Sequence, residues 1–233
     1  MWEAQIRHAL AEVGERIDRA LVRAGRAEGV QVIGITKGHP TEVVQAALQV
    51  GLRALGENRV QELEQKVAEV GRDAAEWHMV GHLQRNKARS ATATSDWIHS
   101  LDSLRLGRTL DREASRAGQP IRALLQVNTS GEASKGGFEP ETAVQALAEL
   151  SELGSLEIHG LMTMAPWTDD EAVLRTTFRR TRELLERCEQ ELPGALRGRE
   201  LSMGMSNDFE IAVEEGATMV RLGTVLFGER EQR

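Results

Sequence analysis

The sequence predicts a closed (β/α)8 barrel of the TIM type with one extra helix at its N-terminus. Short apolar runs rich in β-branched residues alternate with longer amphipathic segments, and this alternation is typical of parallel strands joined by helices. About eight such repeats fit into the 233 residues, a length that suits one barrel domain. An open doubly wound sheet would show the same alternation, but the number of repeats favours the closed barrel.

The extra helix is predicted at the start of the chain, where apolar residues recur every three or four positions from Trp2 to Leu21. The predicted strands follow it: Gln31–Thr36, Arg53–Gly56, Trp77–Val80, Trp97–Ser100, Ile121–Val127, Leu156–Leu161, Glu200–Met203 and Met219–Leu222. Helices are expected after Pro40, after Pro140 and ahead of Pro193, because proline suits a first helical turn and stops a helix that reaches it. No linker or low-complexity tract divides the chain, so residues 1–233 are expected to form a single domain.

Composition excludes several classes of protein. A net charge of -7 argues against a nucleic-acid surface, which needs a basic excess. No run of about 18 apolar residues predicts a membrane helix, and the charged N-terminal segment does not resemble a signal peptide. The single cysteine, Cys188, allows no intramolecular disulfide, so we expect a cytoplasmic protein. The chain has no tyrosine, which excludes any mechanism that needs a phenol from this chain.

Polar residues and glycines gather where the predicted strands end, which is where (β/α)8 barrels carry their active sites. These ends include Thr36-Lys37-Gly38, Gly56-Glu57-Asn58, Gly81-His82, Met162-Thr163, Ser202 to Ser206, and Arg221 to Thr224. A ligand site at this end of the barrel is therefore expected. No metal site is predicted, because the four-residue spacing of His78 and His82 does not give a shared face on a strand that runs into a loop.

Lys37 is the most distinctive of these residues. It follows the apolar run of the first strand, and desolvation at a strand end lowers the pKa of a lysine. The neutral amine can attack an aldehyde and form a Schiff base. Position alone is more typical of a lysine that reaches into solvent, so the assignment depends on what lies nearby.

The loops after the last two strands look suited to a phosphate, as they are in many barrels of this type. Their hydroxyls and glycines are Ser202, Gly204, Ser206, Gly223 and Thr224. Asn207, with Glu210 three residues later, is expected to cap the next helix as in a capping box. An ordinary turn with a helix cap explains the same residues equally well. A strand-end lysine together with a phosphate cradle suggests a phosphorylated aldehyde as the ligand.

Several sequence blocks resemble the pyridoxal phosphate homeostasis proteins, which are single-domain relatives of the alanine racemase N-terminal barrel. The blocks are ITKGHP, GENRVQEL, WHMVGHLQRNK, IHSLDS, VNTSGEASKGG, HGLMTM and LSMGMSNDFEIAVEEGATMVRLGTVLFGER. The resemblance extends from about Val32 to Arg230. It implies a TIM-type barrel that binds pyridoxal 5′-phosphate (PLP).

The resemblance also implies a set of cofactor-binding positions: Lys37, Asn58, His82, Met162, Ser202, Ser206, Arg221, Gly223 and Thr224. Lys37 matches the lysine that forms the Schiff base, and Arg221 matches the arginine that faces the pyridine nitrogen. The phosphate is expected at Ser202, Gly223 and Thr224. Asn58 is expected near the ring, and His82, Met162 and Ser206 are expected to line the pocket.

The chain departs from the family pattern at the rim of this pocket. The first motif reads Thr36-Lys37-Gly38-His39-Pro40 where SKTKP or a similar sequence is usual, and Arg59 follows the GEN motif where tyrosine is common. No role is assigned to His39 or Arg59. Lys135, in a glycine-rich stretch, is expected to be exposed, with a secondary cofactor contact as an alternative.

The expected function is binding and release of PLP without efficient turnover of amino acids, so no residue is assigned as catalytic. Arginine can only donate, so Arg221 would keep the pyridine nitrogen unprotonated and the ring a weaker electron sink. The tyrosine base and second domain of the related racemases are missing. The resemblance implies a role in cofactor and amino-acid homeostasis, with PLP-dependent apoenzymes as partners, and we expect a monomer by analogy.

Two other functions remain open. One is an amino-acid racemase of low activity with His82 as a base. The other is an aldolase in which Lys37 attacks the ketone of a sugar phosphate. A visible absorbance band distinguishes them from each other, because a Schiff base of PLP absorbs visible light and the aldolase intermediate does not.

Overall fold

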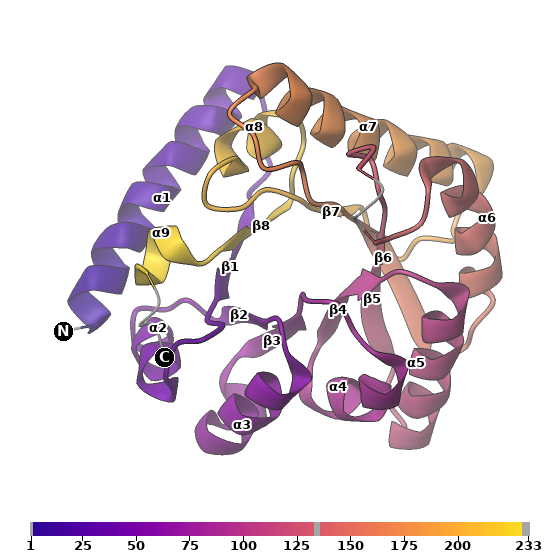
Figure 1. Cartoon of the computed structure of the whole chain (residues 1–233), viewed down its shortest axis with the longest axis horizontal. Helices are drawn as coiled ribbons and strands as arrows, with labels where there is room; N and C mark the ends of the chain where they lie inside the picture. The colour runs from indigo at the N-terminus through magenta and orange to yellow at the C-terminus, as the bar shows by residue number, and fades with distance from the viewer. Residues whose placement is uncertain (1, 133–135, 230–233) are drawn as a thin grey trace.

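The computed structural model describes residues 2–132 and 136–229 and shows a closed barrel of eight parallel strands, paired in sequence order with β8 next to β1 (Figure 1). The strands are β1 (Gln31–Ile35), β2 (Ala54–Glu57), β3 (Glu76–Met79), β4 (Trp97–Leu101), β5 (Ile121–Gln126), β6 (Leu156–Met162), β7 (Glu200–Ser202) and β8 (Met219–Leu222). The predicted TIM-type barrel is confirmed, and each predicted strand differs from the observed one by no more than a few terminal residues.

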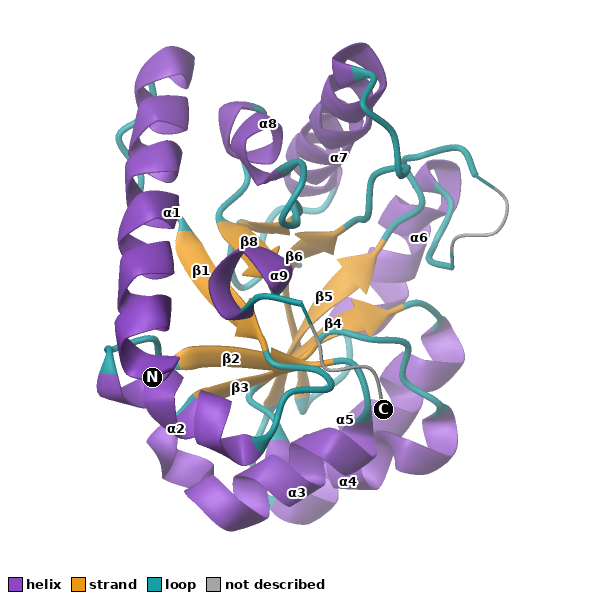
Figure 2. Cartoon of the chain, turned by 60° about the vertical axis from the view of Figure 1, so that its left-hand side comes forward, coloured by secondary structure: helices purple, strands orange, loops and turns teal. Residues whose placement is uncertain are grey.

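Helices surround the strands. They are α1 (Trp2–Ala24), α2 (Thr41–Gln49), α3 (Val60–Val70), α4 (Ala88–Thr94), α5 (Leu104–Ala117), α6 (Pro140–Ser151), α7 (Glu171–Glu191), α8 (Phe209–Glu214) and α9 (Thr224–Phe227). The predicted extra helix is α1, which packs on the outside against α2, α8 and α9 (Figure 2). Within the described residues, no helix is both long and apolar enough to cross a bilayer.

Strand alternation divides the buried side chains into two layers. On β3, Trp77 and Met79 face outward and join the large apolar cluster between strands and helices. Glu76 and His78 alternate with them and therefore face the barrel interior. The apolar interior is a separate small cluster made of Ile33, Ile35, Ala54, Trp97, Leu124, Met162 and Met219. Polar side chains thus share the inside of the barrel with a thin apolar core.

Candidate cofactor site at the barrel mouth

Lys37 lies at the C-terminal end of β1, where the sequence predicts it. Ile33 and Ile35 belong to the interior cluster, and Lys37 is the next residue with the same parity. Its side chain is half-buried, whereas the preceding Thr36 is fully buried on the outer side of the strand. The lysine is therefore placed over the barrel mouth and partly withdrawn from solvent.

A buried ion pair supports the backbone on the outer side of Lys37. Lys66 Nζ lies 2.5 Å from Glu57 Oε1 and donates to the Thr36 carbonyl oxygen at 2.7 Å, and the Thr36 hydroxyl donates to the same Glu57 oxygen at 2.5 Å. The side chains of Lys66 and Glu57 are 6% and 0% exposed. We call Glu57 and Lys66, together with Thr36, which is hydrogen-bonded to both, the outer ion pair. Burial raises the pKa of Glu57, and the attraction and hydrogen bond of Lys66 act against that rise.

The segment on the other side of Lys37 is also held by α3. Gly38 donates its backbone N–H to Glu62 at 2.9 Å. Lys66 was not predicted as a site residue, because a lysine inside an amphipathic helix reads as solvent-exposed. Glu57, at the C-terminal end of β2, holds Thr36 in place.

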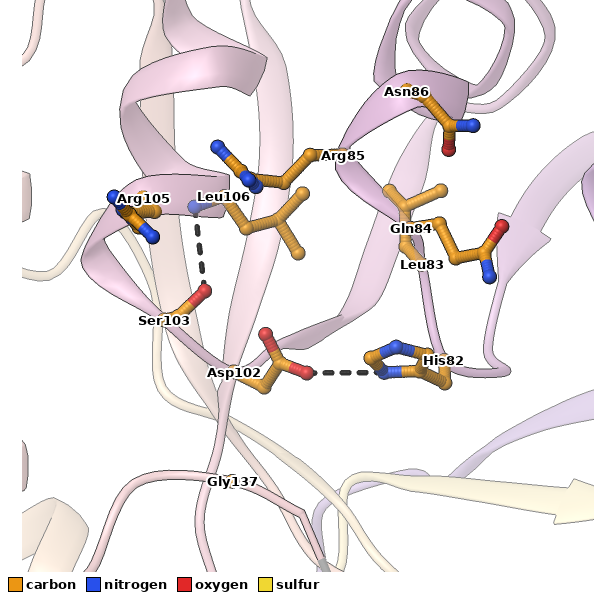
Figure 3. A pocket seen from close by; sticks show the side chains of 10 residues that line it. All are labelled: His82, Leu83, Gln84, Arg85, Asn86, Asp102, Ser103, Arg105, Leu106 and Gly137. Atoms are coloured by element: carbon orange, nitrogen blue, oxygen red, sulfur yellow. Dashed lines mark hydrogen bonds and ion pairs between the residues drawn. The ribbon is translucent and has the colours of Figure 1, made fainter.

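The loops after β2 and β3 are in close contact. A side chain at Gly81 would meet the Asn58 carbonyl oxygen at 2.2 Å, so only glycine fits there. Asn58 is half-buried at this contact. His82, one residue further, is 72% exposed and turns its Nδ1 toward Asp102 Oδ2 at 3.1 Å (Figure 3).

His82 borders a cleft of about 650 Å³ between the β3 and β4 loops. Arg85 and Arg105 also line the cleft (Figure 3). Its walls include none of the other predicted cofactor residues. His82 therefore lies at an exposed rim, engaged with Asp102, and not in an enclosed pocket.

Ser202 and Arg221 are buried polar residues inside the barrel. The Arg221 guanidinium donates from one NH2 group to Ser202 O at 2.7 Å and Ser202 Oγ at 2.6 Å, and from the other to Thr163 O at 2.9 Å. Burial lowers the pKa of Arg221 to about 10, so the side chain remains a cation and a donor at neutral pH. This placement is compatible with the predicted role opposite a pyridine nitrogen.

The phosphate role that the resemblance assigns to Ser202 disagrees with its placement. Ser202 is fully buried inside the barrel, and its hydroxyl already bonds to Arg221 and to His99 Nδ1 at 2.8 Å. A hydroxyl that is closed to solvent and already engaged with two partners is poorly placed to donate to a phosphate oxygen. Ser206, in the same loop, is half-buried and lies nearer the surface.

Ser206 links the loops after β7 and β8. Its Oγ accepts from the backbone N–H of Val225 in the first turn of α9 at 3.4 Å. Gly223, the N-cap residue of α9, has no side chain that could cap the helix, and Thr224 is exposed beside it. The hydroxyls of Ser206 and Thr224 and the backbone at the start of α9 therefore meet at this point of the mouth, where an anion could be held.

The predicted cap of the preceding helix is wrong. α8 begins at Phe209 with Asp208 as its N-cap, and Asp208 Oδ1 accepts from the backbone N–H of Met205 at 2.6 Å. Asn207 is exposed. Glu210 does not complete a capping box, because it forms a two-point ion pair with Arg16 on α1. Tertiary contact with the extra helix overrides the local motif.

Met162 ends β6 and is buried in the interior cluster, below the mouth. Lys135 lies outside the described residues. In the described ranges 2–132 and 136–229, no three or more histidine, cysteine or acidic side chains are grouped so that they could hold a metal ion. Cys188 is buried, and burial raises the pKa of its thiol to about 11.

Comparison with known proteins places these features in a family context. The family model for the alanine racemase N-terminal domain matches residues 11–231. A pyridoxal phosphate homeostasis protein of Aquifex aeolicus is 41% identical over 223 residues, which cover 95% of this chain and 97% of the relative. One of Pseudomonas aeruginosa is 40% identical over 224 residues, covering 95% and 94%.

Solved structures agree. PipY of Synechococcus elongatus, solved with PLP bound, is 39% identical with a TM-score of 0.84, and the match covers 96% of this chain and all of PipY. An alanine racemase of Clostridium difficile is 17% identical with a TM-score of 0.76. That match covers 98% of this chain but 57% of the racemase, so it shows a shared barrel fold only.

Proposed function

The chain belongs to the pyridoxal phosphate homeostasis proteins, within the alanine racemase N-terminal domain family, and from this premise we propose that it binds PLP as a Schiff base on Lys37 without efficient amino-acid turnover. The observation that carries the proposal is the meeting of three groups at one barrel mouth. They are the half-buried Lys37, the hydroxyl-bearing loops after β7 and β8, and the buried cation Arg221.

The donor set matches the parts of PLP. When bound, the cofactor supplies an aldehyde that an amine can attack and a ring that can accept electrons. Lys37 is the amine. Ser206, Thr224 and the backbone at Gly223 are the proposed phosphate donors, with Ser202 serving to position Arg221. Asn58, His82 and Met162 remain proposed neighbours of the ring or the rim.

Two features of this chain support binding without efficient turnover. Arg221 stays protonated at neutral pH, so it donates to a ring nitrogen and does not protonate it. The chain has no tyrosine to act as a second base. His82, the base of the alternative low-activity racemase, is an exposed residue engaged with Asp102. The aldolase alternative has no support from the relatives, one of which is solved with PLP bound.

The proposal extends to the biological role. We infer a cytoplasmic carrier that contributes to cofactor and amino-acid homeostasis and passes PLP to apoenzymes. The names of its relatives support the homeostatic role. A monomeric state is part of the same proposal, and sedimentation of the purified chain tests it.

Absorbance and covalent trapping test the Schiff base. Purified protein is mixed with PLP, its visible spectrum is recorded, and the sample is reduced with borohydride before peptide mass spectrometry. We expect a visible band that borohydride removes, and a cofactor adduct on the peptide that contains Lys37. Lys37→Ala should lose both. Lys87→Ala is the matched control, because Lys87 is also a half-buried lysine but lies before α4 and is not among the proposed cofactor residues, and it should keep both.

Absence of the band from the wild type, or an adduct on another lysine, would refute the assignment of Lys37. Rapid racemisation of an amino acid by the pure protein, lost in Lys37→Ala, would refute the carrier function and favour the racemase.

A further inference from the structure

A line of hydrogen-bonded side chains crosses the inside of the barrel. Arg221 donates to Ser202 Oγ at 2.6 Å, Ser202 Oγ lies 2.8 Å from His99 Nδ1, and His99 Nε2 lies 2.9 Å from His78 Nδ1. His78 Nε2 lies 3.5 Å from Glu76 Oε2. We call these residues the interior chain. It joins the C-terminal end of β8 to Glu76, the first residue of β3, at the opposite end of the barrel.

The chemistry of Arg221 and Glu76, at the two ends of the chain, determines which atom donates in each of its contacts. Arginine only donates, so Ser202 Oγ accepts from Arg221 and can give its own proton to His99 Nδ1. A neutral histidine with an accepting Nδ1 carries its proton on Nε2. His99 then donates to His78 Nδ1, and His78 in turn carries its proton on Nε2, which faces the Glu76 carboxylate.

The reverse arrangement is unfavourable at one specific contact. If His99 Nδ1 donated to Ser202, His99 Nε2 would have to accept from His78 Nδ1, and His78 Nε2 would carry no proton. A bare nitrogen would then face a carboxylate oxygen at 3.5 Å inside the protein. His78 Nε2 is fully buried and makes no hydrogen bond within the described part of the chain, so Glu76 acts on it only through charge at 3.5 Å and this repulsion would be uncompensated.

Burial keeps both rings neutral, as the assignment requires. His78 and His99 are 0% exposed. Desolvation lowers the pKa of His78, and it lowers the pKa of His99 well below the usual histidine value. Each ring therefore holds one proton at neutral pH, and its tautomer is defined by its neighbours.

Glu76 is anchored as a strong acceptor at the far end. Its Oε1 accepts from Trp97 Nε1 at 2.8 Å and lies 3.2 Å from an Arg122 nitrogen. Its Oε2 accepts from Gln31 Nε2 at 2.8 Å. The nearby His78 ring and the hydrogen bond from Trp97 lower the pKa of Glu76 to about 2. The chain thus begins at a buried cation and ends at a fixed anion, so each link polarises the next in the same direction.

We propose that His99 and His78 are positioning residues for the cofactor site: with Arg221 and Ser202 they form a one-way hydrogen-bond chain that the Glu76 carboxylate orients by its charge, and this chain fixes the cofactor-facing guanidinium from the opposite end of the barrel. The proposal rests on the proposed function in one respect, namely that Arg221 faces the cofactor. The direction of the chain is a property of the protein alone.

Nitrogen NMR of the histidine rings tests the direction without any cofactor. In protein labelled with 15N, protonated and bare ring nitrogens have well-separated chemical shifts. We expect His99 and His78 both to carry the proton on Nε2 only, at every pH at which the protein is folded and Glu76 is ionised. His8, which is exposed on α1 and lies outside the chain, is the internal reference. A proton on Nδ1 of either buried ring would overturn the proposal.

Variants test the coupling to the cofactor. His99→Phe removes both ring nitrogens while nearly preserving volume. We expect it to shift the visible absorbance maximum of the PLP-loaded protein and to weaken PLP binding by about tenfold. His99→Gln should restore part of both effects, because an amide can accept from Ser202 and donate to His78. His159→Phe is the matched control, since His159 is a barrel histidine that pairs with Glu157 and lies outside the chain.

A folded His99→Phe with the spectrum and affinity of the wild type would overturn the positioning role. If His99→Phe fails to fold, addition of PLP to the labelled wild type decides the matter. A change in the His78 ring shifts, with none at His8, supports the coupling, and unchanged His78 shifts in the loaded protein contradict it. If NMR finds the predicted tautomers but the protein with PLP shows no visible band, the direction of the chain is supported. The proposed function and the coupling to the cofactor are then refuted.

Discussion

The outer ion pair and the interior chain are two polar systems on opposite sides of the same sheet. In the outer ion pair, a full positive and a full negative charge meet at 2.5 Å and are buried together between the barrel and α3. In the interior chain, the charges of Arg221 and Glu76 are separated by two neutral histidines and a serine. One system fixes a single point of the backbone, and the other spans the length of the barrel.

The difference follows from how each system satisfies its buried groups. Each charge of a buried ion pair is stabilised mainly by its partner, so loss of either residue leaves the other charge buried and unpaired. Glu57 Oε2 has no hydrogen-bond partner among the described residues, so the pair depends heavily on Lys66. In the interior chain the connecting groups are neutral. Loss of one of them leaves its neighbours with an unmade hydrogen bond but creates no new unpaired charge.

The largest effect is expected from breaking the outer ion pair. Lys66→Met should destabilise the fold by about 3–5 kcal/mol, because it leaves the buried Glu57 carboxylate without a counter-charge and with only the Thr36 hydroxyl bonded to it. Denaturant unfolding followed by circular dichroism measures the change. Lys66→Met with Glu57→Gln should recover a substantial part of the loss, since no net charge then stays buried.

Glu64→Gln, on the same helix, is the control and should change the stability little. A loss in Lys66→Met no greater than that of the control would show that Lys66 does not stabilise the strand end.

A smaller effect is expected from pH, which should change the stability contributions of Glu76 and Glu57 in opposite directions. The pKa of Glu76 is lowered from 4.5 to about 2, so between these values the unfolded chain binds a proton that the folded chain does not. Its contribution is complete above about pH 4.5 and is lost as the pH falls toward 2. The pKa of Glu57 is raised, so its protonation stabilises the fold at low pH and that contribution is lost as the pH rises through its folded value.

Unfolding free energies measured from pH 2 to pH 6 test this difference. Glu76→Gln should flatten the fall in stability below pH 4.5, and Glu57→Gln should not. An unchanged acid dependence in Glu76→Gln would mean that Glu76 is not held as an anion.

The smallest effect is expected at the exposed rim, where neither kind of burial applies. His82→Ala removes a contact with Asp102 from a side chain that is 72% exposed, and such pairs contribute less than about 1 kcal/mol. Stability should stay within about 0.5 kcal/mol of the wild type. Titration with PLP checks the proposed role at the same time, and unchanged affinity would remove His82 from the cofactor site.

The sequence by itself determined the barrel, because the alternation of strands and helices needs only local periodicity. It also determined the position of Lys37 and of the two loops after β7 and β8, since parallel strands bring their C-terminal ends to one face. The parity of a strand even indicates that Glu76 and His78 share a side. These predictions depend on neighbours along the chain or on the symmetry of the fold.

Only the tertiary structure decided which polar groups meet. Ser202 lies in the loop motif of a phosphate site, yet it is enclosed by His99 from β4 and Arg221 from β8. Lys66 looks like a surface lysine, yet it reaches Thr36 and Glu57 behind the first strand. The sequence motif predicts that Glu210 completes a capping box, yet its carboxylate forms an ion pair with Arg16 on α1. Such partners come from distant parts of the chain, and a buried polar group is assigned by whichever donor or acceptor the packing brings within hydrogen-bond distance.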